Sequence, residues 1–173
     1  VPIDIRAVSI NTFLSPLFAV AMEKTLAGSD PIAENRTAFQ TLAIYLNGES
    51  IAQLIGEEAA SEIEAAPYIE TRLLRRQDLA QHLVSTAAIT ASAGADLAQM
   101  LSTTKEAYDA RYRSGFSFSD LTANSVGVTI AQLATTRTET AKVMQDRLAN
   151  LQNESDYMPQ VGNNRDGLSE TDF

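Results

Sequence analysis

The sequence contains no cysteine, no tryptophan and only one histidine, His82. The absence of cysteine excludes a disulfide framework, a thiolate zinc site and a cysteine nucleophile. Basic residues are also scarce: 13 Lys and Arg stand against 22 Asp and Glu in 173 residues, a net charge of −9. Because this excess repels phosphate backbones and anionic membrane surfaces, we expect no nucleic-acid partner.

Long hydrophobic runs are missing as well. The longest stretch without Asp, Glu, Lys or Arg covers residues 79–95 and is 17 residues long. A transmembrane helix needs about 20 predominantly apolar residues, so we expect a buried helix here and no transmembrane span. The chain begins at Val1 instead of Met. We therefore expect that upstream residues were removed by signal cleavage or proteolysis, or are simply not seen.

Hydrophobic residues recur with helical periodicity along almost the whole chain, and no stretch shows sustained strand-like alternation. The pattern predicts an all-α protein, a single-domain bundle of about six helices within residues 1–153. Asn47-Gly48, Ser50 as an N-cap and Gly94 as a C-cap mark some of the helix ends. The predicted helices cover residues 4–27 with a break or kink near Pro16, 33–46, 51–65, 68–93, 96–111, and from Ser117 or Ser119 to about 150.

Residues 154–173 have a different composition from the rest of the chain. Pro159, Gly162 and Gly167 break any helix there, while Tyr157, Met158 and Leu168 are apolar side chains that need a groove. We predict an extended tail that lies against the helical body or wraps another chain.

Polar side chains stand at helical spacing in three parts of the sequence, so each set shares one face of its helix. The three sets are Asp78 and His82, then Lys105, Glu106, Asp109 and Arg111, and then Ser117, Asp120 and Asn124. Ser117, three residues before Asp120, has the spacing of a capping box. Gly127 and Ala131 would let the last helix approach a neighbour closely. We expect members of the three sets to converge in space, namely Asp78, His82, Glu106, Asp120 and Asn124.

The three sets together resemble a known family over about residues 75–131. The patterns D-x-A-Q-H, K-E-x-x-D-x-R and G-x-S-x-x-D-L-x-x-N-x-x-G are matched from Asp78 to His82, from Lys105 to Arg111 and from Gly115 to Gly127. This order resembles the core of the YfiM-like family of small cell-envelope lipoproteins and, more distantly, the VanZ-like family of teicoplanin-resistance proteins. The flanking segments resemble uncharacterised bacterial proteins that carry the same core in soluble form. The resemblance implies a bacterial cell-envelope setting and no established reaction.

Two interpretations of the polar residues remain open. In the first, they pair with one another and with helix ends, and thereby fix the register of the helices. In the second, His82, Asp78, Glu106 and Asp120 bind a divalent metal ion whose bound water hydrolyses a substrate. A serine nucleophile at Ser117 or Ser119 is a weaker alternative, because neither serine lies in a G-x-S-x-G elbow after a strand.

We favour the first interpretation. It predicts a non-enzymatic structural or partner-binding protein of the bacterial cell envelope, periplasmic or exported. On this interpretation the chain binds another protein chain or subunit and uses no cofactor. A metal-dependent hydrolase with a single-histidine, carboxylate-rich site is the alternative.

Overall fold

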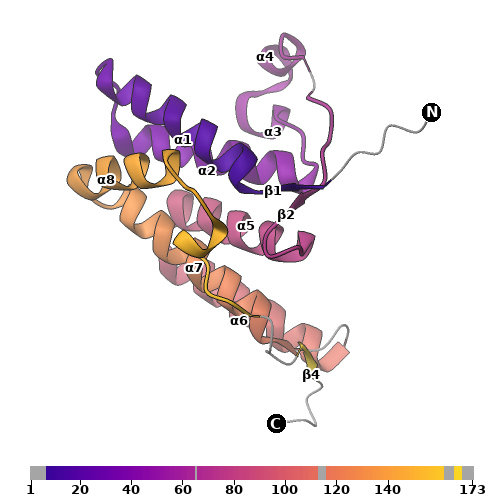
Figure 1. The fold of residues 1–173 in the computed structure, drawn as a ribbon. Helices are drawn as coiled ribbons and strands as arrows, with labels where there is room; N and C mark the ends of the chain where they lie inside the picture. The colour runs from indigo at the N-terminus through magenta and orange to yellow at the C-terminus, as the bar shows by residue number, and fades with distance from the viewer. Residues whose placement is uncertain (1–6, 65, 113–115, 162–165, 169–173) are drawn as a thin grey trace.

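The structure, a computed structural model, describes residues 7–64, 66–112, 116–161 and 166–168. Within these residues, six helices of 12 to 18 residues pack together, accompanied by short helices and short strands (Figure 1). The prediction of a single-domain helical bundle is therefore confirmed. The strands are a minor addition that hydrophobic periodicity did not predict.

The first two long helices are α1 (Asn11–Leu26) and α2 (Pro31–Asn47). α1 runs through Pro16 as one helix, so of the predicted break or kink there the break is wrong. Pro16 is exposed in the second turn of α1, where the missing amide removes a single backbone hydrogen bond. α2 begins where the Asp30 side chain accepts a hydrogen bond from the Ala33 amide at 3.1 Å, and it ends at Gly48 in the left-handed conformation, φ +67°.

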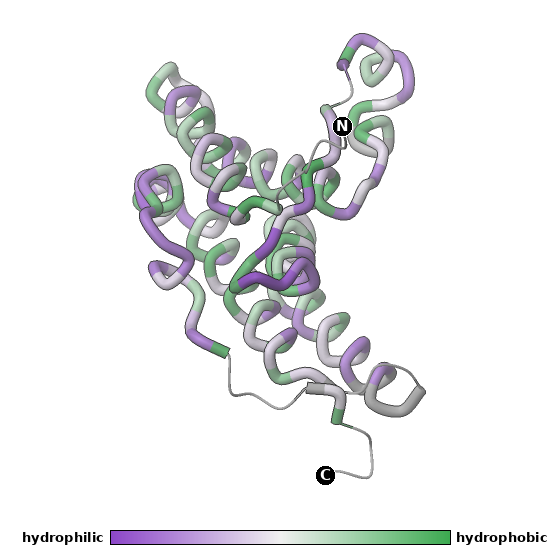
Figure 2. Tube along the Cα trace, turned by 45° about the vertical axis from the view of Figure 1, so that its right-hand side comes forward, coloured by the Kyte–Doolittle hydropathy of each residue, from purple (hydrophilic) through white to green (hydrophobic). Residues whose placement is uncertain are grey.

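The predicted third helix, residues 51–65, is wrong as a continuous element. The structure has two short helices here, α3 (Ala52–Ile55) and α4 (Glu57–Ser61). They are separated by Gly56, whose φ of +86° and ψ of +157° no right-handed helix can contain. Both short helices stand away from the main helical body (Figures 1 and 2).

The predicted fourth helix, residues 68–93, begins too early. Strand β2 (Thr71–Arg72) pairs in parallel with β1 (Val8–Ser9), and helix α5 (Gln77–Ala93) follows only after a tight turn. In that turn Leu74 and Arg75 have φ of +50° and +67°, and Leu73 and Arg76 exchange backbone hydrogen bonds. The error arises because a strand that pairs with a distant segment carries no local periodic signal.

The remaining long helices are α6 (Ala95–Tyr112), α7 (Phe118–Thr135) and α8 (Thr138–Ala149). The predicted single helix from 117 to 150 is therefore wrong. Arg137 has an extended conformation, φ −137° and ψ 141°, between α7 and α8. Across this break the buried Asn35 amide of α2 donates to the carbonyls of Ala134 at 2.8 Å and Ala141 at 3.1 Å. A residue of α2 thus joins the end of α7 to the first turn of α8.

The described part of the C-terminal segment lies against the helical body. A 3₁₀ turn, Glu154–Asp156, is followed by Met158 and Val161, which are both buried. Strand β4 (Asp166–Leu168) pairs in antiparallel fashion with β3 (Phe116–Ser117) just before α7, and Leu168 is buried there. The rest of the predicted tail lies outside the described residues.

Hydrophobic and hydrophilic positions alternate along the helices (Figure 2). The apolar core is built mainly on α1, α2, α5 and α7, and its largest fully buried side chains include Phe18, Phe39, Leu14, Leu42, Leu79 and Leu83. Among the described helices, we find none whose length and hydropathy would suit a membrane span.

Candidate functional site

The polar site forms where α5, α6 and α7 meet, and Gly127 sets the distance between two of these helices. A Cβ atom at Gly127 would lie 2.3 Å from both the Leu83 carbonyl oxygen and Thr86 Oγ1, so only glycine allows this contact. The Thr86 hydroxyl also donates to the Asn124 carbonyl at 3.2 Å. This close approach brings His82 of α5 against Asn124 of α7.

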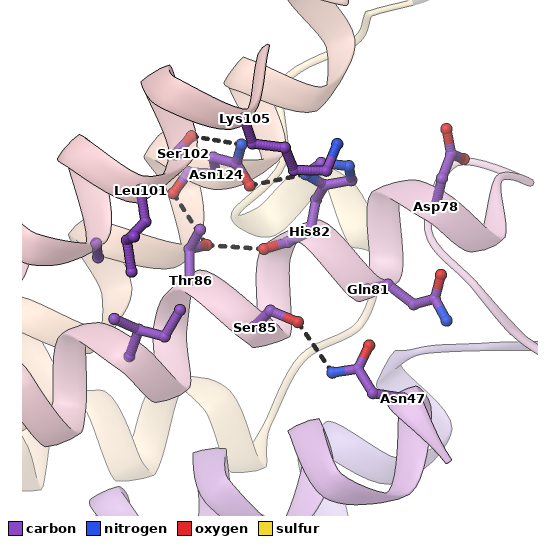
Figure 3. A pocket seen from close by; sticks show the side chains of 12 residues that line it. Asn47, Asp78, Gln81, His82, Ser85, Thr86, Leu101, Ser102, Lys105 and Asn124 are labelled. Carbon is purple, nitrogen blue, oxygen red and sulfur yellow. Dashed lines mark hydrogen bonds between the residues drawn. The ribbon is translucent and has the colours of Figure 1, made fainter. Parts of the chain in front are cut away.

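Both ring nitrogens of His82 face protein groups. Nδ1 lies 3.0 Å from Asn124 Oδ1, and Nε2 lies 3.3 Å from Asp120 Oδ2. The Asn124 amide nitrogen in turn donates to Ser102 Oγ of α6 at 2.6 Å. Figure 3 shows this chain of side chains bridging the three helices. His82 is thus held between two residues of α7, and Ser102 links the group to α6.

Arg76 connects the two aspartates that flank the histidine. Its guanidinium donates to Asp78 through Nε at 3.1 Å and Nη2 at 2.5 Å, and through Nη2 to Asp120 Oδ1 at 3.2 Å. Burial acts to raise the pKa of Asp78, but the hydrogen bond and charge of Arg76 hold it below the ordinary value. Burial raises the pKa of Asp120, against the lowering influence of His82 and Arg76.

Glu106 is the most deeply buried charged group of the site, with 1% of its side chain exposed. Its Oε2 atom accepts a hydrogen bond from the Ser117 amide at 3.3 Å, whereas Oε1 has no hydrogen-bond donor. The Lys105 ammonium lies 3.6 Å from Oε1 but is half exposed, and it donates to Asp109 at 2.7 Å. Burial raises the pKa of Glu106, and the charge of Lys105 offsets only part of that rise.

The start of α7 is fixed by Ser117, whose hydroxyl accepts a hydrogen bond from the Asp120 amide at 3.0 Å. The N-cap half of the predicted capping box is therefore present. Because this bond engages the Ser117 hydroxyl, the side chain acts as a cap. Ser119 is buried, with 1% of its surface exposed.

Three side chains lie close enough to share one ion. One ligand atom each from His82, Glu106 and Asp120 lies within 4.8 Å of the other two. The surrounding charges are unequal, because four carboxylates face two permanently charged cations among the described side chains. The carboxylates are Asp78, Glu106, Asp109 and Asp120, and the cations are Arg76 and Lys105.

A cavity of about 330 Å³ adjoins the histidine (Figure 3). Its walls combine polar groups of α2, α5 and α6 with an apolar side formed by Ile89, Ala98 and Leu101. Asn47 crosses one end of the cavity and donates to Ser85 at 2.9 Å.

Most of the residues singled out in the sequence meet at this site. His82, Glu106, Asp120 and Asn124 come together, whereas Asp78 pairs with Arg76 and stands apart from the histidine, one turn earlier on α5 (Figure 3). Asp120 and Asn124 of α7 occupy both ring nitrogens of His82, and Asp78 is linked to this group through Arg76, which also donates to Asp120. Lys105 and Asp109 form the outer edge, and the side chain of Arg111 lies outside the described part.

Two important residues were not assigned to the site from the sequence. Arg76 precedes α5 and reaches the site only because of the tight turn before it. Ser102 carries no charge and has no distinctive spacing to Asn124. A usable signal existed for Arg76, since it lies two residues before Asp78 at the start of a predicted helix.

Comparison of the chain with protein-family models, curated proteins and solved structures gives no match in any of the three. The resemblance to the YfiM-like and VanZ-like families stays a prediction.

Proposed function

We propose that this chain is a non-enzymatic structural or partner-binding protein of the bacterial cell envelope, in which the polar network fastens α5, α6 and α7. The observation that carries the proposal is the pairing of His82. Each of its ring nitrogens has a protein partner, and the Asn124 amide is engaged at both ends. Side chains paired in this way across three helices hold the helices in one arrangement.

The buried polar groups of the network depend on one another for their hydrogen bonds. Removing one partner leaves the other desolvated without a hydrogen bond, at a cost of about 1–3 kcal/mol. Such a network favours one helix register, because a shift of α7 along α5 would separate Asn124 and Asp120 from His82.

Partner binding is supported by apolar side chains that remain exposed beside the site. Leu97, Met100 and Leu101 on the first turns of α6 are 39%, 58% and 45% exposed. Ala98, between them, is buried and lines the same cavity as Leu101. Exposed apolar groups clustered on one short segment are typical of a protein-protein contact. The envelope location rests on the family resemblance of residues 75–131.

In-cell crosslinking tests the partner. A photoreactive amino acid at Met100 should give one discrete crosslinked product in the native bacterium. The same amino acid at Glu58, on the exposed surface of α4, is the control and should not give that product. Equal or absent crosslinking at the two positions would contradict a partner on α6.

A metal-dependent hydrolase is the second candidate function. Two observations favour it, the cavity that reaches His82 and the Oε1 atom of the buried Glu106, which has no hydrogen-bond donor. The test is turnover of chromogenic phosphate esters, carboxylic esters and peptides by zinc- or manganese-loaded protein. Turnover that Glu106→Gln abolishes would favour the hydrolase over the structural proposal.

A further inference from the structure

The contact between His82 and Asp120 places two electron-pair donors against each other. If Nδ1 of His82 donates its proton to Asn124 Oδ1, a neutral imidazole presents the lone pair of Nε2 to Asp120 Oδ2, 3.3 Å away. Two such atoms attract only when a positive centre lies between them, either a proton or a metal ion. A histidine that binds metal through one nitrogen commonly donates from the other to a protein oxygen, as His82 does toward Asn124.

Glu106 supplies an independent observation that points to a ligand at the same place. Its side chain is 1% exposed, its Oε1 atom has no hydrogen-bond donor, and one of its oxygens lies within 4.8 Å of the ligand atoms of His82 and Asp120. A buried carboxylate oxygen without a donor is costly unless a cation lies close to it, and the half-exposed Lys105 ammonium stays 3.6 Å from Oε1.

We propose that His82, Glu106 and Asp120 bind one divalent transition-metal ion, which joins α5, α6 and the first turn of α7. Ligands about 2.1 Å from a tetrahedral metal ion are separated by about 3.4 Å. The 3.3 Å between His82 Nε2 and Asp120 Oδ2 already has this length. One carboxylate oxygen of Glu106 lies within 4.8 Å of both of these ligand atoms and is the third ligand of the proposed site.

The neighbouring charges are consistent with a dication. Four carboxylates around two permanent cations leave two negative charges in excess, which a divalent ion neutralises. Arg76 occupies Oδ1 of Asp120 and leaves Oδ2 for the ion. Lys105 keeps its closer partner, Asp109, when the ion takes its place beside Glu106.

The ligand set also selects the class of metal. One imidazole nitrogen with two carboxylate oxygens suits Zn²⁺, Mn²⁺ or Fe²⁺, whereas Mg²⁺ and Ca²⁺ prefer sites made entirely of oxygen. Three protein ligands leave at least one coordination position, and the adjoining cavity can supply water to it. The proposal that a metal ion binds here depends neither on a protein partner nor on hydrolysis. Its test therefore measures only the binding of the metal ion.

The experiment starts from the full chain after removal of metals by a chelator. Calorimetric titration with Zn²⁺ and with Mn²⁺ should give one site per chain, and saturating ion should raise the melting temperature by about 5–10 °C at 100-fold excess over Kd. Mg²⁺ and Ca²⁺ at the same concentrations should give much smaller effects. Absence of a one-to-one site for both Zn²⁺ and Mn²⁺ would overturn the proposal.

Matched variants locate the ion. Glu106→Gln should weaken binding at least 10-fold, because it removes a charged ligand. Asp109→Asn is the control, since this neighbouring carboxylate pairs with Lys105 and lies outside the three-ligand group. Equal weakening by both substitutions would mean nonspecific attraction to acidic side chains and would overturn the proposal.

A spectroscopic readout covers the case in which a variant fails to fold. Co²⁺ added to the unsubstituted chain should give the intense visible absorption of four- or five-coordinate cobalt with nitrogen and oxygen ligands. The weak spectrum of hydrated, six-coordinate cobalt would contradict binding at these three residues.

Discussion

At the scale of single residues, the site depends on groups that burial makes unfavourable to ionise. Glu106 and Asp120 both have their pKa raised mainly by burial. Asp78 lies one turn before His82 on α5, and Arg76 lowers its pKa against the effect of burial. The pKa values of carboxyl groups in one small region are thus shifted in opposite directions by their surroundings. The buried Oε1 atom of Glu106 has no hydrogen-bond donor and faces only the half-exposed Lys105 ammonium, 3.6 Å away, among the described cations that pair with it.

Glu106→Gln should stabilise the metal-free protein at neutral pH. Because the pKa of Glu106 is higher in the folded state than its ordinary value of 4.5, folding favours the protonated form, and the cost of the charge appears as pH rises through the raised pKa. The charges that face it are Lys105, Asp120 and His82. Melting temperatures of the variant and the parent, measured in chelator, should converge near and below pH 4.5 and diverge above it.

The control for this prediction is Glu58→Gln, an exposed carboxylate on α4 for which we expect no such divergence. A Glu106→Gln protein that melts below the parent at every pH would show that the carboxylate stabilises the fold without a metal.

At the scale of elements, helices were predictable where a local signal marks their ends. Gly48 ends α2, Gly94 ends α5 and Ser117 begins α7, as expected from the sequence. Most of the wrongly predicted helix boundaries are caused by contacts with residues that are distant in the sequence. The strand at 71–72 exists because it pairs with residues 8–9, and the gap between α7 and α8 is bridged by Asn35 of α2. Only the break at Gly56 had a local signal that was missed.

Gly127→Ala should destabilise the protein strongly. The added methyl group would lie 2.3 Å from the Leu83 carbonyl oxygen and from Thr86 Oγ1, so α7 must move away from α5. Overpacking of this kind costs about 1–3 kcal/mol or more, which corresponds to a fall in melting temperature of about 2–12 °C.

Ser125→Ala provides the comparison for Gly127→Ala, because residue 125 lies on the exposed side of the same helix. We expect a change within about 0.5 kcal/mol for it. Equal melting temperatures for the two variants would contradict the tight contact between α5 and α7.

At the scale of the whole molecule, Glu154 connects three parts of the chain that are distant in sequence. Its carboxylate accepts from the Ser9 hydroxyl at 2.6 Å and from the Leu74 amide at 2.8 Å. It thereby ties the C-terminal segment to β1 and to the turn that positions Arg76. No spacing in the sequence could reveal this link, because it spans 145 residues between Ser9 and Glu154.

Glu154→Ala should loosen that turn and, through it, the position of Arg76. We expect a loss of about 1–3 kcal/mol, because the Leu74 amide is left without an acceptor. Hydrogen exchange should become faster at the Leu74 amide, while Gln160→Ala, an exposed neighbour in the same segment, should leave it unchanged. Unaltered protection of Leu74 in the Glu154 variant would refute the connection.

The melting temperatures of His82→Ala and His82→Gln in the presence of a chelator show whether the polar network around His82 is structural. Alanine removes the histidine partner of Asn124 Oδ1 and of Asp120 Oδ2, so we expect a loss of about 1–3 kcal/mol, or about 2–12 °C. Glutamine keeps a donor of similar reach and should cause a much smaller loss. An alanine variant that melts at the temperature of the parent would contradict a structural role for the network.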